Sequence, residues 1–151
     1  MRTLVTCIFA AALAASAEAQ GLGYGVLGAG GTTGIVEAPS ISGAVGGAWF
    51  VRPQVSLGGE VGMFDRFIVS SANVGVHAPA GLVLAPFVTA GYSHMGVADG
   101  EGSFSAINVG VGLDAWRARH AGLRIELRDH IRLDRRSTSH YWAIRAGFFF
   151  R

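Results

Sequence analysis

The sequence contains no lysine and only one cysteine, Cys7. All twelve basic residues are arginines, and the net charge of +2 gives no general case for nucleic-acid binding. Because Cys7 lies in a segment that we expect to be removed, the mature chain offers no disulfide and no cysteine metal site. The length of 151 residues suits a single domain.

The sequence also lacks an apolar run long enough to cross a bilayer as a helix. The stretch from Leu4 to Ala15 is shorter than the roughly 20 residues that a span needs. It follows the basic start at Arg2 and precedes a small-residue cleavage pattern at 17–19. We therefore expect residues 1–19 to be a secretory signal peptide and residues 20–151 to form the mature domain. A retained membrane anchor is the alternative.

The chain is nevertheless hydrophobic. Its mean hydropathy is +0.41, and only 15% of its residues are charged. Backbone polar groups in lipid must be satisfied within the protein. For an exported hydrophobic chain without a spanning helix, the other structure that can span a membrane is therefore a closed β-barrel.

Apolar and polar residues alternate with period 2, which indicates strands with one apolar face. In residues 123–133 the odd positions are apolar except for Asp129, and every even position is charged or histidine. The same alternation recurs in 55–63, 68–76 and 106–115. The pattern predicts eight strands, at 21–31, 40–51, 55–65, 68–78, 82–94, 103–116, 122–134 and 138–150.

The expected connections alternate in kind, with one short exception. Short, turn-rich links fall at 52–54, 78–81 and 117–121, and longer polar links fall at 32–39 and 95–102. An even number of strands of about ten residues, with short links at one end and longer links at the other, is typical of outer-membrane barrels. The predicted fold is therefore an all-β, eight-stranded antiparallel up-and-down transmembrane barrel.

Three stretches carry a family resemblance: "LVLAPFVTAGYS" (82–93), "INVGVGLDAWRARHAGLRIELRDH" (107–130) and "RAGFFFR" (145–151). With them, the mature chain resembles the small eight-stranded outer-membrane β-barrel family, the group around the transmembrane domain of outer membrane protein A. The resemblance implies a bacterial outer-membrane location. It also implies a C-terminal signal for the barrel-assembly machinery, which we assign to Gly147, Phe148 and Phe150. Here Arg151 follows the last aromatic residue.

The polar face of the predicted strands would fill the barrel. The interior of an eight-stranded barrel is just wide enough for side chains, and a lone buried charge costs several kcal/mol, so each inward charge needs a partner. We predict a static ion network that fixes the register. The alternative is a gate, proposed for family relatives, in which the ion pairs rearrange and open a narrow path. The predicted members are Glu60, Asp114, Arg124, Glu126, Arg128 and Arg145.

The opposite face would meet lipid. Large aromatic residues are expected there as girdles near the strand ends. The expected members are Trp49, Tyr92, Trp142, Phe148 and Phe150.

Asp129 breaks the alternation and points by parity toward lipid. An acid is unfavourable at mid-depth in a bilayer and tolerated near the interface. We expect Asp129 to lie near the outer rim, or on a β-bulge that turns it inward.

An enzymatic alternative is a serine and a histidine at the lipid-facing rim, as in outer-membrane barrels that remove acyl chains from lipid A. The adjacent pairs Ser93-His94 and Ser139-His140 point to opposite faces and cannot form a nucleophile–base couple. Ser93 and His140 could still meet from different strands. We expect no catalytic site.

Two other motifs are rejected. Residues 23–28 match the spelling of a dinucleotide fingerprint, but no strand precedes them and no helix is expected after them. Asp99 and Glu101, with His94 nearby, lack the spacing of a calcium loop and indicate a solvated hairpin tip. We expect no cofactor and no metal.

The sequence thus predicts a monomeric outer-membrane protein with a structural or envelope-interaction role and no enzymatic activity. Its expected partners are outer-membrane lipid, the barrel-assembly machinery during insertion, and lipopolysaccharide, whose phosphates Arg135 and Arg136 would contact. No nucleic-acid partner is expected. Three alternatives stay open: a narrow, porin-like channel for small solutes, a lipid A-modifying enzyme, and a soluble secreted barrel with an apolar interior.

Overall fold

The computed structural model describes most of residues 21–151. The ranges are 21–33, 39–79, 82–98, 100, 102–118, 120–133 and 137–151. The expected signal peptide at 1–19 lies outside them. Within these ranges no helix is long and apolar enough to cross a membrane.

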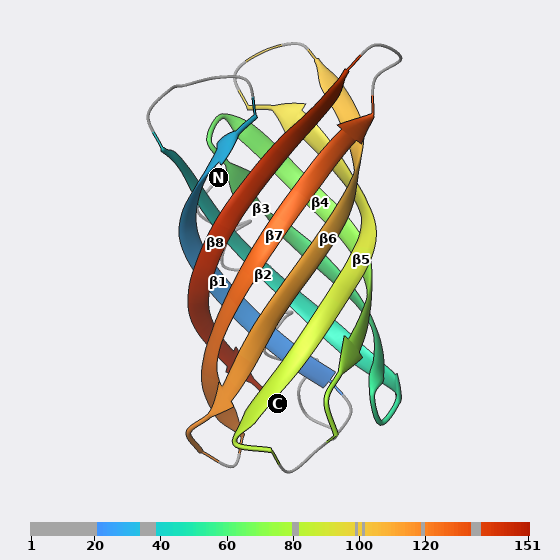
Figure 1. Cartoon of the computed structure of the whole chain (residues 1–151), viewed down its shortest axis with the longest axis vertical. Helices are drawn as coiled ribbons and strands as arrows, with labels where there is room; N and C mark the ends of the chain where they lie inside the picture. The colour runs from blue at the N-terminus through green and yellow to red at the C-terminus, as the bar shows by residue number, and fades with distance from the viewer. Residues whose placement is uncertain are drawn as a thin grey trace, which may run out of the picture.

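The described residues form eight antiparallel strands in a closed barrel, which confirms the predicted fold class (Figure 1). Each strand pairs with the strand before it and the strand after it in the sequence. The strands are β1 (Gly21–Thr32), β2 (Ser40–Arg52), β3 (Val55–Phe64), β4 (Phe67–His77), β5 (Leu84–Val97), β6 (Ser103–Trp116), β7 (Ala121–Leu133) and β8 (Thr138–Phe150).

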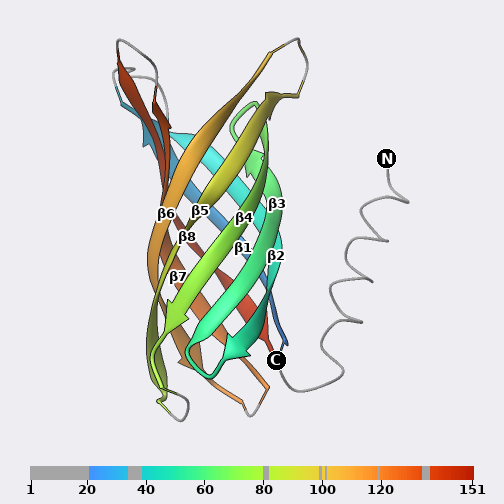
Figure 2. The same ribbon diagram turned by 90° about the vertical axis from the view of Figure 1, so that its right-hand side faces the viewer.

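The pairing of β1 with β8 closes the barrel. Its register runs without interruption from Gly23 opposite Phe150 to Thr32 opposite Tyr141. Closure leaves no strand edge, so the backbone donors and acceptors of the sheet are paired within the protein. The strands are long and strongly tilted, and they give the barrel an elongated shape (Figure 2).

The two ends of the barrel differ in their connections. At the terminal end, where β1 begins and β8 ends, the links are 53–54, 78–83 and 117–120. The opposite end, here called the distal end, carries 33–39, 65–66, 98–102 and 134–137. The contrast in link length is therefore smaller than predicted.

The largest difference from the predicted strands is in β5. It begins at Leu84 and ends at Val97, whereas the prediction was 82–94. The strand continues because Met95 is completely buried against other apolar side chains at the distal end. In addition, the amide of Val97 donates to the carbonyl of Gly102 and so extends the hairpin.

The alternation of side chains separates a polar interior from an apolar exterior. Along β7, Arg124, Glu126, Arg128 and His130 are buried inside. Their neighbours Leu123, Ile125 and Leu127 are exposed on the outside. The reverse arrangement, expected for a soluble barrel with an apolar interior, is not found in the described strands.

Two apolar clusters lie inside the barrel, one toward each end. The terminal cluster consists of Leu22, Tyr24, Val26, Phe50 and Phe149, with Ala44 and Trp116 packed against it. The distal cluster consists of Phe64, Val69, Met95, Ala106 and Ala143, with Phe67, Phe104 and Tyr141 packed against it. Of the charged residues of the interior, Arg124 lies against Tyr24 and Phe149 of the terminal cluster.

Strand β1 approaches β8 so closely that some inward positions admit no side chain. A Cβ atom at Gly30 would lie 1.7 Å from the carbonyl oxygen of Trp142. The atom that this Cβ would overlap belongs to the backbone of β8, so the overlap cannot be relieved by a side-chain rotation. Glycine at position 30 is therefore a requirement of the closing pair.

We expect Gly30→Ala to destabilise the barrel by about 1–3 kcal/mol, the usual effect of overpacking. The matched control is Gly96→Ala in β5, where a Cβ atom would have no neighbour within 4 Å. That variant should be neutral or slightly stabilising, because alanine restricts the unfolded chain. Urea unfolding of the refolded variants in detergent or lipid gives both values, and equal stability of the two would contradict the close approach of β1 and β8.

Candidate functional site: an ion network inside the barrel

The structure brings the six predicted charged residues into one region of the barrel interior. They come from β3 and from the three consecutive strands β6, β7 and β8, and all six are buried. They are Glu60 of β3, Asp114 of β6, Arg124, Glu126 and Arg128 of β7, and Arg145 of β8.

Glu126 lies at the centre of the network. Its Oε1 accepts hydrogen bonds from Nε of Arg128 at 2.8 Å and from the NH2 group of the same guanidinium. Its Oε2 accepts a hydrogen bond from Arg145 at 2.8 Å. One carboxylate therefore neutralises part of the charge of two arginines on neighbouring strands.

Arg145 connects this centre to the opposite wall of the barrel. Its two terminal nitrogens donate to the two carboxylate oxygens of Glu60, at 2.7 and 3.0 Å. This bidentate geometry is the strong form of an arginine–carboxylate pair. The hydroxyl of Tyr24 also donates to Oε2 of Glu60, at 2.9 Å. The bonds join β1, β3, β7 and β8 across the interior.

Arg124 and Asp114 form a separate pair nearer the terminal end. The guanidinium donates to both carboxylate oxygens, each at 2.8 Å. Its central carbon lies 4.4 Å from the ring centroids of both Tyr24 and Phe87. The cation is thus held by a carboxylate and by two aromatic faces, which replace the water that it loses.

Toward the distal end the network continues through neutral groups. Arg128 donates to the side-chain oxygen of Asn108 at 2.7 Å, and Asn108 donates to Ser93 Oγ at 2.9 Å. Ser93 Oγ also lies 3.0 Å from Nδ1 of His130 and 2.8 Å from Ser71 Oγ. The polar residues of four strands therefore form one connected chain of hydrogen bonds.

The six charges balance, three positive and three negative, and each has an oppositely charged partner. Breaking a buried pair by removing one partner leaves an uncompensated charge and is strongly destabilising. The geometry of these pairs links the strands, and any rearrangement of the network would have to re-pair every charge.

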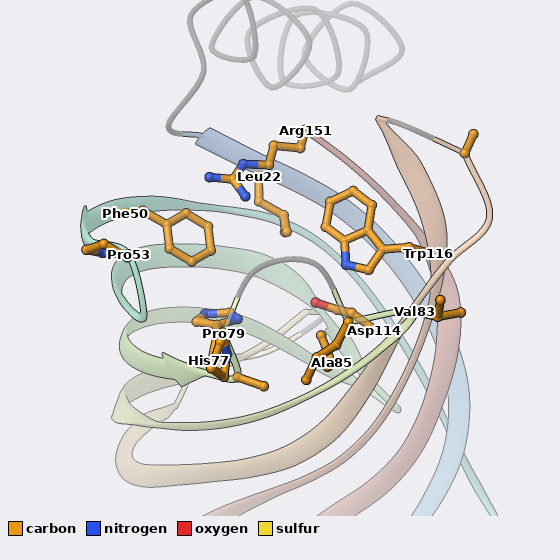
Figure 3. A pocket seen from close by; sticks show the side chains of 13 residues that line it. Leu22, Phe50, Pro53, His77, Pro79, Val83, Ala85, Asp114, Trp116 and Arg151 are labelled. Carbon is orange, nitrogen blue, oxygen red and sulfur yellow. The ribbon is translucent and has the colours of Figure 1, made fainter.

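Free space within the barrel is limited. A cavity of about 360 Å³ opens at the terminal end, with Phe50 and Trp116 on opposite sides and an oxygen of Asp114 pointing into it (Figure 3). Further inside, a cavity of about 20 Å³ lies between Tyr24, Thr89 and Arg128. The inner cavity has room for about one water molecule.

The serine and histidine of the enzymatic alternative do not meet. Ser93 faces the interior with no exposed surface and contacts His130 instead. His140 lies on the outside of β8, where its Nδ1 is 2.7 Å from Oδ2 of Asp129. The Ser93–His140 pair considered from the sequence is therefore wrong.

Asp129 itself lies on the outside of β7, four residues before the strand ends at the distal end. The pairing of β7 with β6 and with β8 continues through it without a shift, opposite Val109 and Trp142. The β-bulge that was one of two expectations is absent from this described stretch. Asp129 is accommodated near the distal rim by its contact with His140.

The expected girdle residues lie on the outer face. Trp49, Tyr92, Trp142 and Phe148 are exposed, and Phe150 is half-buried. Of the expected assembly signal, Gly147 faces inward and Phe148 faces outward. The ring of Phe150 covers Gly23 on the outside of β1, because a Cβ atom there would lie 2.4 Å from that ring. Asp99, Glu101, Arg135 and Arg136 lie outside the described residues.

Sequence reasoning did not assign Tyr24, Ser93 and Asn108 to the network. Asn108 lies on the polar face of β6, so the alternation of that strand could have assigned it to the network. Tyr24 lies in a strand that is almost entirely glycine and apolar residues, and nothing in the sequence marks its hydroxyl as a partner of Glu60.

Known eight-stranded outer-membrane barrels share this fold, as the family resemblance implied. The N-terminal barrel domain of OprF from Pseudomonas aeruginosa is 19% identical, with a TM-score of 0.65 over 87% of this chain and 96% of that chain. Neisserial surface protein A is 11% identical, with a TM-score of 0.62 over 86% of this chain and 95% of that chain.

The likeness extends to a transmembrane β-barrel designed de novo. It is 15% identical, with a TM-score of 0.62 over 89% of this chain and 98% of that chain. No protein-family model matches the sequence, and no curated protein matches it either. The class that the fold defines is therefore the small eight-stranded up-and-down barrel with a polar interior.

We expect Glu126→Ala to lower the free energy of unfolding by about 3–5 kcal/mol, because Arg128 and Arg145 lose a buried partner. The control is Arg52→Ala at the exposed terminal end of β2, which should change stability by no more than about 0.5 kcal/mol. Equilibrium unfolding in lipid vesicles measures both. A Glu126 variant as stable as the control would show that the network does not hold the barrel together.

Proposed function

We propose that the chain is a bacterial outer-membrane protein with a structural or envelope-interaction role and a closed, ion-paired interior. It acts as a monomer and without catalysis. The observation that carries the proposal is the sidedness of the barrel: paired charges fill the inside, and apolar side chains cover the outside of all eight strands.

The exterior supports the membrane location. Large apolar side chains are exposed on every strand, whereas soluble monomers rarely expose apolar patches beyond about 300–600 Å². From Trp142 to Phe150, β8 advances about 26 Å at roughly 3.3 Å per residue. At a tilt of about 40° this is about 20 Å of height, close to the apolar band of about 25 Å in outer-membrane barrels.

The orientation in the membrane is proposed by analogy with outer-membrane barrels. The terminal end faces the periplasm, and the distal end faces the outside. The expected signal peptide at 1–19 serves export, and Gly147, Phe148 and Phe150 serve recognition by the barrel-assembly machinery. In the sequence Arg135 and Arg136 follow β7 and precede β8, and we propose that they contact lipopolysaccharide phosphates.

A closed interior argues against the porin-like alternative and against a gate. Apolar clusters lie toward both ends, and each of the six charged residues of the network has an oppositely charged partner. The enzymatic alternative loses its support because Ser93 is enclosed in the interior. The proposed envelope-interaction role therefore depends on the outer surface and on the links at the distal end.

Fractionation tests the location. We expect the full-length protein, expressed in a Gram-negative host, to be recovered in the outer-membrane fraction and to change its gel mobility on heating, as a folded barrel does. Recovery only from the soluble periplasm would overturn the proposed location.

A planar-bilayer recording tests the closed interior. The purified protein should give no steady, reproducible conductance level, because apolar clusters and paired charges occupy the described interior. A stable conductance that changes with Glu126→Ala would contradict the static network and favour the narrow channel.

A further inference from the structure

The outer face of the barrel carries polar residues near the distal strand ends. Ser70, His94 and Ser105 lie directly across from one another on β4, β5 and β6. Asp129 and His140 lie on β7 and β8. All five are within four residues of the distal ends of their strands, and they border the apolar exterior.

The Asp129–His140 pair is the only carboxylate–histidine contact that the described residues form on this outer face. The Asp129 side chain is 24% exposed, the His140 side chain is 40% exposed, and 2.7 Å separates Oδ2 from Nδ1. A carboxylate at that distance accepts, so Nδ1 of His140 must carry the proton. Nε2 is therefore the ring nitrogen left for a ligand, and on the neutral ring it is an acceptor.

The acid is the less accessible partner. Oδ1 of Asp129 is covered and has no hydrogen-bond partner among the described residues. Asp129 therefore orients His140 and does not itself face a ligand. Buried acids that fix the tautomer of a more exposed histidine are a recurrent way to present Nε2 to a polar group.

The surroundings suit a sugar. Trp142 stands directly opposite Asp129 on β8, and its exposed ring offers a flat apolar face to the C–H groups of a pyranose. A neighbouring cavity of about 450 Å³ is lined by Trp142 together with Thr32, Ser40 and Arg66, but not by Asp129 or His140. His140 projects from the same outer face of β8, two residues from Trp142.

We propose that Asp129, His140 and Trp142 form a binding site for the sugar headgroup of an outer-leaflet glycolipid. His140 accepts a hydrogen bond from a sugar hydroxyl or amide, Asp129 holds the imidazole in place, and Trp142 stacks on the ring. The proposal rests on the proposed membrane location and deepens it, because it names the lipid class that the outer surface selects.

The test uses the full mature chain in lipid bilayers with two spin-labelled probes. One is a neutral monoglucosyl diacylglycerol, and the other is phosphatidylcholine, which has no hydrogen-bond donor. Neither has a net charge, so attraction to the arginines does not contribute. We expect the glucolipid to associate about threefold more strongly, the ratio that a single net hydrogen bond provides.

His140→Gln and Asp129→Asn should each reduce this preference to about one. The matched control is His94→Gln, which removes an exposed histidine near the distal end of β5 that has no carboxylate partner among the described residues. That control should keep the preference. Equal association of the two probes with the unmodified protein would overturn the proposal, as would an equal loss in the His94 variant.

The heat-dependent gel shift is recorded for each sample before the lipid measurement. A chain that does not fold into the bilayer fails the proposed membrane location, whereas a folded barrel without lipid preference fails only the sugar site. Asp129 lies on β7 and His140 lies on β8. If one of the two variants does not fold, the other variant still tests the pair.

Discussion

The interior of the barrel depends on the carboxylate of Glu126. It is held between Arg128 of its own strand and Arg145 of the next strand, and through Arg145 it is linked to Glu60 on the opposite wall. A shift of either strand by one residue would send these side chains to the lipid face, because side chains alternate with period 2. The ion network and the register therefore specify each other.

The small residues of the sequence follow from this constraint. Arginine and glutamate side chains are long, and the interior of an eight-stranded barrel offers little space. A Cβ atom at Gly110 would lie 2.6 Å from Oε1 of Glu126 and 2.9 Å from Nε of Arg128. Glycine on the inner face of β6 therefore leaves room for the charged pair of β7. The inward glycine at position 110 and the neighbouring charges of β7 are two parts of one packing arrangement.

Much of this architecture could be predicted from alternation alone. The number of strands, their order and the shared face of all six network residues follow from period 2 and from the closure of the barrel. Parity alone does not say which of the two faces is inside. The pairings do not follow from period 2, because parity gives the face of a residue and not its height. The contact of Tyr24 with Glu60 joins β1 to β3 across the interior, and no pattern in either strand indicates it.

The distal part of the molecule was less predictable for a related reason. Strand β5 ends at Val97 because Met95 packs into an interior cluster assembled from other strands. The contact between Asp129 and His140 depends on the register of β7 with β8, in which each residue lies diagonally from the other. The sequence shows an acid on the lipid face, and only the paired strands show what compensates it.

Resemblance in fold leaves the role of the barrel open, because a barrel designed de novo matches this chain about as well as Neisserial surface protein A does. What all such barrels need is a closed sheet, an apolar exterior and a satisfied interior, and these requirements explain most of this sequence. An aspartate on the outer face serves none of these three requirements. Charged groups on the lipid face reduce stability by an amount that grows with depth. Asp129 opposes the requirement for an apolar exterior, yet it contacts His140 and lies opposite Trp142. A function particular to this protein is therefore best sought at Asp129.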